Sequence, residues 1–209
     1  MSNTSGAVRT TAQSNVRNMV TIAMLGAVSM VLYIFDFPLW FAPSFYKIDF
    51  SEIPVMIGSF ALGPAAGALI ELVKCLLKLV VKGTSTAFVG DIANYLMGCA
   101  LVVPAGMIYR KKKSKKNAVI GMVVGTLTLV VVGCILNAYV LLPTYSKAFG
   151  MPVDALIEMG SAVNPGIKDI FSFVLLAVAP FNALKGIIVS AVTLVLYKYV
   201  SPILKGNLV

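Results

Sequence analysis

The sequence predicts an all-α integral membrane protein with six transmembrane helices, both termini in the cytoplasm, and an aromatic outer loop that acts as a lid. Composition gives two of the observations behind this fold class: 59% of the 209 residues are hydrophobic and only 12% are charged, with a mean hydropathy of +0.93. A soluble domain carries about 25% charged residues. The third observation is a series of long apolar runs separated by polar or proline-containing stretches.

Six apolar runs are expected to form the transmembrane helices, since a spanning helix needs about 20 apolar residues. They are residues 16–35, 53–62, 65–81, 88–109, 118–142 and 181–200. The second run is short and ends at Gly63-Pro64, which predicts a tight turn between two helices; one long kinked helix is the alternative. The chain then divides into a cytoplasmic tail (1–15), a transmembrane domain (16–201) and a second cytoplasmic tail (202–209).

A long stretch, residues 143–180, separates the fifth run from the sixth. It contains its own short apolar run, IFSFVLLAVA. About 10 residues are too few to cross a bilayer. We therefore expect this run to be re-entrant or to cap the bundle.

The charges predict the orientation, because basic residues near membrane ends mark the cytoplasmic side. The cluster RKKKSKK (110–116) lies between the fourth and fifth runs, on the same side as both termini. The net charge of +9 is explained by such inner residues facing anionic head groups, so nucleic acid is not an expected partner. Most of the acids then lie at or near the outer ends: Asp36, Asp49, Glu52, Asp91, Asp154, Glu158 and Asp169.

Four polar residues inside the runs predict a binding pocket that opens outward. Asn182 and Lys185 are three residues apart in the last run, which places them on one helix face. Asn94 and Asn137 lie at a similar depth in two other runs. Snorkelling of Lys185 to the head groups and interhelical hydrogen bonds of the asparagines are the alternatives, but polar groups within spans usually face a cavity or a partner.

The first outer loop is rich in aromatic residues. Its sequence FDFPLWFAPSFYKIDFSE is stiffened by Pro38 and Pro43. Two interpretations stay open: an interfacial aromatic belt, or a lid over a flat aromatic ligand. The aromatic residues are Phe35, Phe37, Trp40, Phe41, Phe45, Tyr46 and Phe50.

Two further patterns occur on the early helices. Glu71, Lys74 and Lys78 share one helix face, which predicts an intrahelical Glu71–Lys74 ion pair or coupling to a partner or substrate. The sequence AMLGA, Ala23 to Ala27, has small residues four apart, a spacing that permits close approach by another helix.

Several classes of site are excluded by composition. The chain has no histidine, which rules out His-dependent nucleophile systems and His-based metal sites. Cys75, Cys99 and Cys134 lie in apolar runs without metal-ligand spacing, so neither a disulfide nor a metal is expected. The sequence has no phosphate loop for ATP. These absences argue against a site built on histidine, on a metal or on bound ATP.

Three stretches carry a resemblance to a known family. They are KIDFSEIPVMIGSFALGPAAGALIELVKCLLKLV (47–80), GDIANYLMG (90–98) and PFNALKGIIVS (180–190). With them, the chain resembles the riboflavin-specific substrate-binding (S) components of energy-coupling factor (ECF) vitamin transporters over nearly its whole length. AMLGA matches the AxxxA pattern by which S components are expected to dock onto their coupling subunit.

The resemblance implies a prokaryotic multi-pass protein of the cell membrane that binds riboflavin on the outer side. It implies that the chain itself is not an enzyme and has no cofactor. It also implies a transmembrane coupling subunit and two ATPases as partners, which power release inward. The coupling subunit would dock at Ala23 and Ala27. The riboflavin site implied by the matching positions comprises Asn94, Asn137, Asn182, Lys185 and the loop residues Phe45, Tyr46 and Lys47.

Other functions remain open from the residues. One is an S component for another vitamin or for flavin mononucleotide, because Lys185 and Lys47 can tolerate a phosphate. A second is a stand-alone secondary transporter. A third is a membrane enzyme that acts on lipid, although the lack of histidine and of clustered carboxylates within the runs argues against it.

Overall fold

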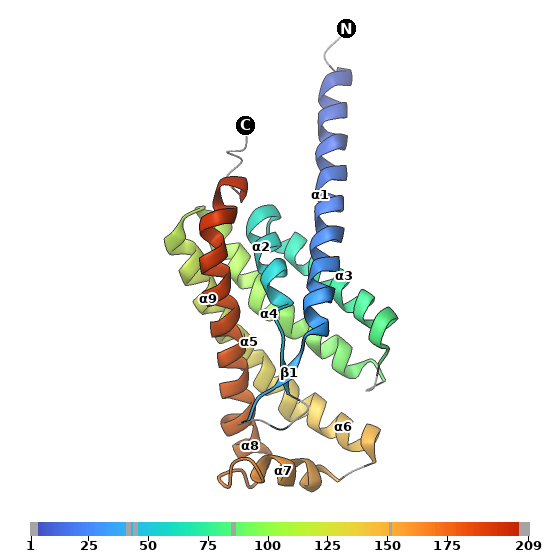
Figure 1. Ribbon diagram of the computed structural model, residues 1–209, viewed down its shortest axis with the longest axis vertical. Coiled ribbons are helices and arrows are strands. Elements are labelled where there is room, and N and C mark those ends of the chain that lie inside the picture. Colours follow the sequence, from blue (N-terminus) through green and yellow to red (C-terminus); the bar gives the residue numbers. More distant parts are fainter. Residues whose placement is uncertain (1–3, 41–42, 44–45, 85–86, 151, 205–209) are drawn as a thin grey trace.

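A computed structural model describes residues 4–40, 43, 46–84, 87–150 and 152–204, and it is almost entirely helical (Figure 1). This confirms the predicted all-α class. The two short strands of the first loop pair antiparallel, Phe37 with Ile48 and Pro38 with Lys47. The elements in chain order are α1 (Thr4–Ile34), β1 (Phe37–Pro38), β2 (Lys47–Ile48), α2 (Glu52–Leu62), α3 (Pro64–Lys82), α4 (Val89–Lys111), α5 (Lys115–Leu136), the π-helix η1 (Asn137–Leu141), α6 (Leu142–Phe149), α7 (Val153–Ser161), α8 (Ile170–Phe173), the π-helix η2 (Val174–Val178) and α9 (Ala179–Leu204).

Four helical segments are long and apolar enough to cross a membrane, and they make this a multi-pass helical protein. They are residues 15–34, 89–111, 115–147 and 170–196. Helix α2 has 11 residues, about 17 Å of helix, which is little more than half of the roughly 30 Å hydrocarbon core. Helix α3 has 19 residues but carries four charged side chains. The six-span count therefore stays a prediction.

The last membrane segment begins earlier than the sequence suggested. α8, η2 and α9 follow one another without a break from Ile170, so the run IFSFVLLAVA is the first part of the final helix. The prediction of a re-entrant or capping segment was wrong. Proline lacks a backbone N–H and its ring clashes with the carbonyl four residues earlier. The wider π-turn η2 lies directly before Pro180, and in this turn the Ala179 N–H donates to the Val174 carbonyl.

The same arrangement precedes Pro143. There η1 ends with the Leu142 N–H donating to the Asn137 carbonyl, and the helix continues into α6. Single π-turns inside helices often occur at functional sites. Both π-turns here bring an asparagine to their edge: Asn137 begins η1, and Asn182 follows η2 by one turn.

Helix α2 lies at the centre of the bundle and packs against α1, α3, α4 and α9. Its side chains Val55, Met56 and Phe60 are buried with Leu101 and Tyr109 of α4. The predicted tight turn at Gly63-Pro64 is confirmed: Gly63 adopts φ 105°, which favours glycine, and Pro64 starts α3.

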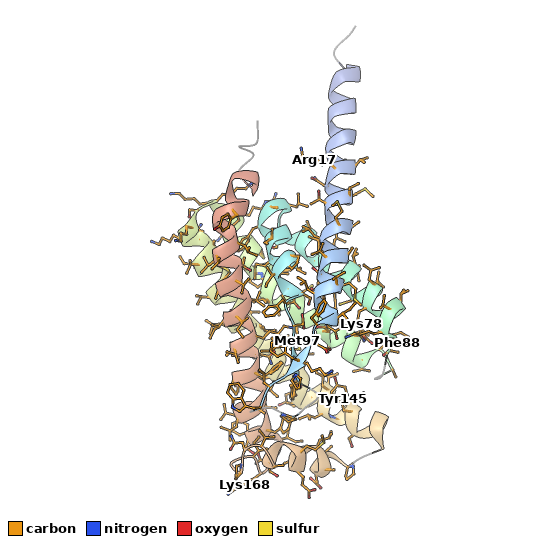
Figure 2. All side chains as sticks on the ribbon, in the orientation of Figure 1. Arg17, Lys78, Phe88, Met97, Tyr145 and Lys168 are labelled. Carbon is orange, nitrogen blue, oxygen red and sulfur yellow. The ribbon has the colours of Figure 1, made fainter. Side chains whose placement is uncertain are left out.

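The start of α1 and the end of α9 lie at the same end of the molecule, and the turn between α4 and α5 lies toward that end (Figure 1). Arg17 lies toward this end and Lys168 at the opposite one (Figure 2). Both termini and the basic turn between α4 and α5 thus lie toward one of the two ends of the molecule. We refer to them below as the terminal end and the loop end.

Candidate ligand-binding site

A cavity of about 200 Å³ lies where α1, α4, η1, α6 and α9 meet the first loop. Met97 of α4 and Tyr145 of α6 both line it, and both lie in the half of the molecule toward the loop end (Figure 2). A smaller hollow continues inward from it, past Asn94 and Lys185 to Glu52. The cavity thus has a polar inner end. Aromatic side chains form much of the remaining wall: Tyr33, Tyr46, Tyr145 and Phe181.

Most of the sequence-predicted site residues come together here. Asn94, Asn137, Lys185, Tyr46 and Lys47 all line the cavity, although they come from three helical segments and a loop. Asn182 does not line it. Its side chain is fully buried directly behind the wall, and the backbone of Gly133 in α5 lies so close that a Cβ there would be 2.7 Å from the Asn182 Nδ2 atom. Phe45 lies outside the described residues.

The two buried asparagines are held by the helices that carry them. The Asn137 Nδ2 donates to the Gly133 carbonyl at 2.7 Å, and the Asn182 Nδ2 donates to the Val178 carbonyl at 3.0 Å. An amide has two N–H donors and two acceptor lone pairs, so each keeps hydrogen-bonding capacity. Among the described residues, the Asn182 Oδ1 has no hydrogen-bond partner.

Tyr46 fixes the first loop to the membrane helices. Its hydroxyl donates to the Asn137 Oδ1, and its ring packs on Phe181 and Phe173, with centroids 5.1 and 6.3 Å away. Burial raises the pKa of Tyr46 above its ordinary value, so the hydroxyl keeps its proton. A protonated hydroxyl can act as donor to Asn137 and orient that amide toward the cavity.

Lys185 is part of a network of ion pairs. Its Nζ lies 3.4 Å from the Asp49 Oδ2 and 3.7 Å from the Glu52 Oε1. Burial opposes ionisation of Asp49, but Lys185 and Lys74 outweigh it and hold the pKa of that carboxyl below its usual range. Asp49 also accepts a hydrogen bond from the Ser51 N–H at 2.8 Å. The Lys185 ammonium therefore reaches the cavity already neutralised.

The network continues into the bundle through Lys74. Its Nζ lies 2.9 Å from Glu52 and 2.6 Å from Glu71, which confirms the predicted intrahelical Glu71–Lys74 pair. All three side chains are almost fully buried. Removing one partner of a buried pair costs about 3–5 kcal/mol, so the network is a strong structural constraint. Lys78, on the same helix face, pairs with Asp91.

Sequence reasoning missed the part that Asp49 and Glu52 play. It used them only to mark the outer side, because acids beside a loop are ordinarily solvated. The only signal was their spacing: Asp49 and Glu52 flank the start of an apolar run and so enter the bundle with α2. The lysines that they meet, Lys74 and Lys185, are distant in sequence.

Asp36 links the cavity to its more exposed edge. It lies 3.3 Å from Lys47 and 3.4 Å from Lys82. The side chain of Lys47 is 46% exposed, against 12% for Lys185. Lys47, the loop lysine of the predicted site, is therefore also paired with a carboxylate.

The AMLGA segment presents two different faces. Gly26 packs against α3, where a Cβ would lie 2.5 Å from Val73 Cγ1. Ala23 and Ala27 are exposed, together with Val20, Met24 and Val28. The glycine therefore serves packing within the chain, and the two alanines belong to an open apolar face of α1.

Metal binding and disulfide formation have little support in the described part of the chain. No group of three His, Cys, Asp or Glu side chains there is placed to hold a metal ion. Cys75, Cys99 and Cys134 are free thiols. The cavity offers amides, hydroxyls and paired charges, which suit the binding of a polar, partly aromatic molecule.

Comparison with known proteins identifies the family. The family model described as "ECF transporter, substrate-specific component" matches residues 17–197. The chain belongs to this family. It is 34% identical over 189 residues to the riboflavin transporter RibU of Staphylococcus aureus, and this alignment covers 90% of this chain and 93% of the relative. It is 29% identical to the riboflavin transporter FmnP of Bacillus subtilis, with 90% and 93% covered.

A solved structure agrees with this assignment. The S component of a bacterial ECF transporter superposes with a TM-score of 0.71 at 32% identity, over 91% of this chain and 99% of that one. The resemblance drawn from the three sequence stretches is thereby confirmed. Because the family consists of transport components and its relatives are named as transporters, the protein is not an enzyme.

Proposed function

We propose that this S component binds riboflavin from the outer side of the prokaryotic plasma membrane, in the cavity between α4, η1, α9 and the first loop. The observation that carries the proposal is the meeting of Asn94, Asn137 and Lys185 at one polar cavity that four aromatic side chains also line. Relatives of similar length named as riboflavin transporters support the same substrate.

The chemistry of the cavity matches a flavin. The isoalloxazine ring is flat and apolar on its faces, and one edge carries alternating donors and acceptors. Tyr46 and Phe181 supply aromatic surface against the ring faces. Asn94 and Lys185 stand at the inner end, where amide and ammonium groups can pair with the polar edge. Asn182 supports this wall from behind.

The size of the cavity indicates how much of the ligand it can enclose. About 200 Å³ is less than the roughly 300–1,000 Å³ of sites that enclose a drug-sized ligand. We infer that the ring system occupies the cavity and that the ribityl chain extends through the mouth, beside Asp36 and Lys47. Movement of the first loop, anchored by Tyr46, would cover the ligand, as the predicted lid requires.

Transport would depend on partners. The chain itself carries no phosphate loop, so energy would come from a coupling subunit and two ATPases. The exposed Ala23 and Ala27 would form the docking face on α1. Riboflavin is cargo in this scheme, and the protein needs no cofactor.

The paired lysines favour riboflavin over flavin mononucleotide. A phosphate needs unpaired positive charge, but Lys185 is neutralised by Asp49 and Glu52, and Lys47 by Asp36. With the ribityl chain at the mouth, the phosphate of flavin mononucleotide would lie beside Asp36, whose carboxylate would repel it.

The first experiment is an absorption spectrum of the detergent-purified protein, followed by mass spectrometry of any released ligand and by titration with riboflavin. We expect a yellow sample, or quenching of added riboflavin fluorescence at one site per chain. Asn94→Ala and Lys185→Ala should weaken binding, while Asn117→Ala at the terminal end should not. A colourless protein that fails to quench riboflavin would contradict the proposal, as would unchanged affinity in a folded Lys185→Ala variant.

A further inference from the structure

A second hollow, larger than the polar cavity, lies on the outside of the bundle between α5 and α9. Its volume is about 340 Å³ and its lining is apolar, including Val119, Met122 and Leu127 of α5 and Ile187 and Leu194 of α9. α1 contacts α2 and α3, and α9 stands at the other side of the view in Figure 1. This groove is therefore distinct from the α1 face proposed for docking.

The groove has one closed end. A Cβ at Gly186 would lie 2.5 Å from Thr126 Cγ2, so the two helices touch there. From this contact the groove follows α5 back to Val119. Leu127 and Val119 are eight positions apart, which corresponds to about 12 Å of helix. It is thus a short slot that runs toward the terminal end of the molecule.

Basic side chains stand at the terminal end of this slot. Lys115 and Lys116 form the first turn of α5 and are exposed. Positions 115, 119, 122 and 126 follow the spacing of one helix face, so Lys115 lies in line with the α5 wall of the groove. Among the residues that the structure describes, neither lysine forms an ion pair.

We propose that this groove binds one acyl chain of an anionic phospholipid whose phosphate is held by Lys115 and Lys116. An extended hydrocarbon chain fits a slot of this length and apolar character. Juxtamembrane lysines attract anionic head groups, and the positive charge beside the slot selects anionic lipid over zwitterionic lipid. The inference does not depend on which vitamin the protein carries.

The test is native mass spectrometry of the full chain with an equimolar mixture of phosphatidylglycerol and phosphatidylcholine that share the same acyl chains. We expect one phosphatidylglycerol adduct to survive activation that strips phosphatidylcholine. Lys115→Gln/Lys116→Gln should lower affinity for phosphatidylglycerol by about thirtyfold, the effect of two basic residues at an anionic surface. Lys147→Gln, an exposed lysine of α6, is the charge control and should change nothing.

The groove itself is tested by filling it. Ala191→Trp places a large ring in the slot from α9, at an exposed lining position, and should abolish the adduct. Val131→Trp adds the same bulk at an exposed position of α5 outside the slot and should preserve it. Size-exclusion elution and the thermal unfolding midpoint establish that each variant is folded. Equal retention of both lipids would overturn the proposal, as would an adduct that persists in Ala191→Trp.

Discussion

The Lys185 ammonium and the Asp49 carboxylate lie 3.4 Å apart although 136 positions separate them in sequence. Asp49 stands between β2 and α2, and Lys185 is in the second turn of α9. This contact fastens the first loop to the last helix at the inner end of the cavity. It also neutralises the cation that the sequence had offered as a free binding group.

Replacement of Asp49 tests how much the Lys185–Asp49 contact contributes to stability. Asp49→Asn keeps the shape but removes the charge, and we expect the free energy of unfolding to fall by about 1.5–3 kcal/mol, the range for hydrogen bonds to charged groups. The loss of stability is measured as a lower thermal unfolding midpoint in detergent. Asp154→Asn, at an exposed position of α7, is the matched control and should leave the midpoint unchanged. Equal midpoints for both variants would show that the Lys185–Asp49 contact contributes nothing to stability.

Lowering the pH should reduce the difference in thermal unfolding midpoint between the wild type and Asp49→Asn. Burial opposes ionisation of Asp49, but Lys185 and Lys74 hold its pKa below the usual range. A carboxyl whose pKa is lowered by folding stabilises the protein above its unfolded pKa, about 3.9, and this contribution is lost as pH falls through the folded value. Unfolding midpoints at pH 7, 5, 4 and 3 should converge only below about pH 4. Convergence already near pH 6 would contradict the lowered pKa.

Tyr46→Phe removes the hydroxyl that donates to Asn137. The ring contacts with Phe181 and Phe173 stay, and only the hydroxyl is lost. One hydrogen bond contributes about 0.5–1.5 kcal/mol, so riboflavin affinity should fall about two- to twelvefold in a fluorescence titration. Tyr139→Phe removes a hydroxyl from an exposed residue of η1 and should bind like the wild type. Tighter binding by Tyr46→Phe would show that the hydroxyl competes with the ligand.

Flavin mononucleotide should bind more weakly than riboflavin because the lysines near the cavity are paired. Asp36→Asn removes the carboxylate shared by Lys47 and Lys82. We expect this variant to improve binding of the phosphorylated flavin while affinity for riboflavin changes little. Competition titrations give the ratio of the two dissociation constants, with Asp154→Asn as control. An unchanged ratio would mean that the phosphate does not approach Lys47.

The α1 face should matter for transport and not for binding. Ala23→Leu/Ala27→Leu adds bulk at exposed positions, so riboflavin binding in detergent should persist while uptake by cells with the complete transporter is lost. Gly26→Leu is the informative contrast, because its side chain would collide with Val73 and should destabilise the isolated chain. Uptake that survives the double alanine substitution would place the docking face elsewhere.

The sequence by itself determined the class of the protein, because the bilayer forces long apolar stretches into helices and the turn at Gly63-Pro64 has strong local chemistry. It also singled out Asn94, Asn137 and Lys185, since polar groups within apolar runs are costly and need a reason. Only the tertiary structure decided that Asp49 and Glu52 reach Lys74 and Lys185, because pairing over such sequence distances has no local signature. It also decided that Asn182 lies behind the cavity wall. Finally, it decided that the last helix starts at Ile170 and passes through Pro180 with a π-turn before it, because the length of one short apolar run does not show whether it continues into the next.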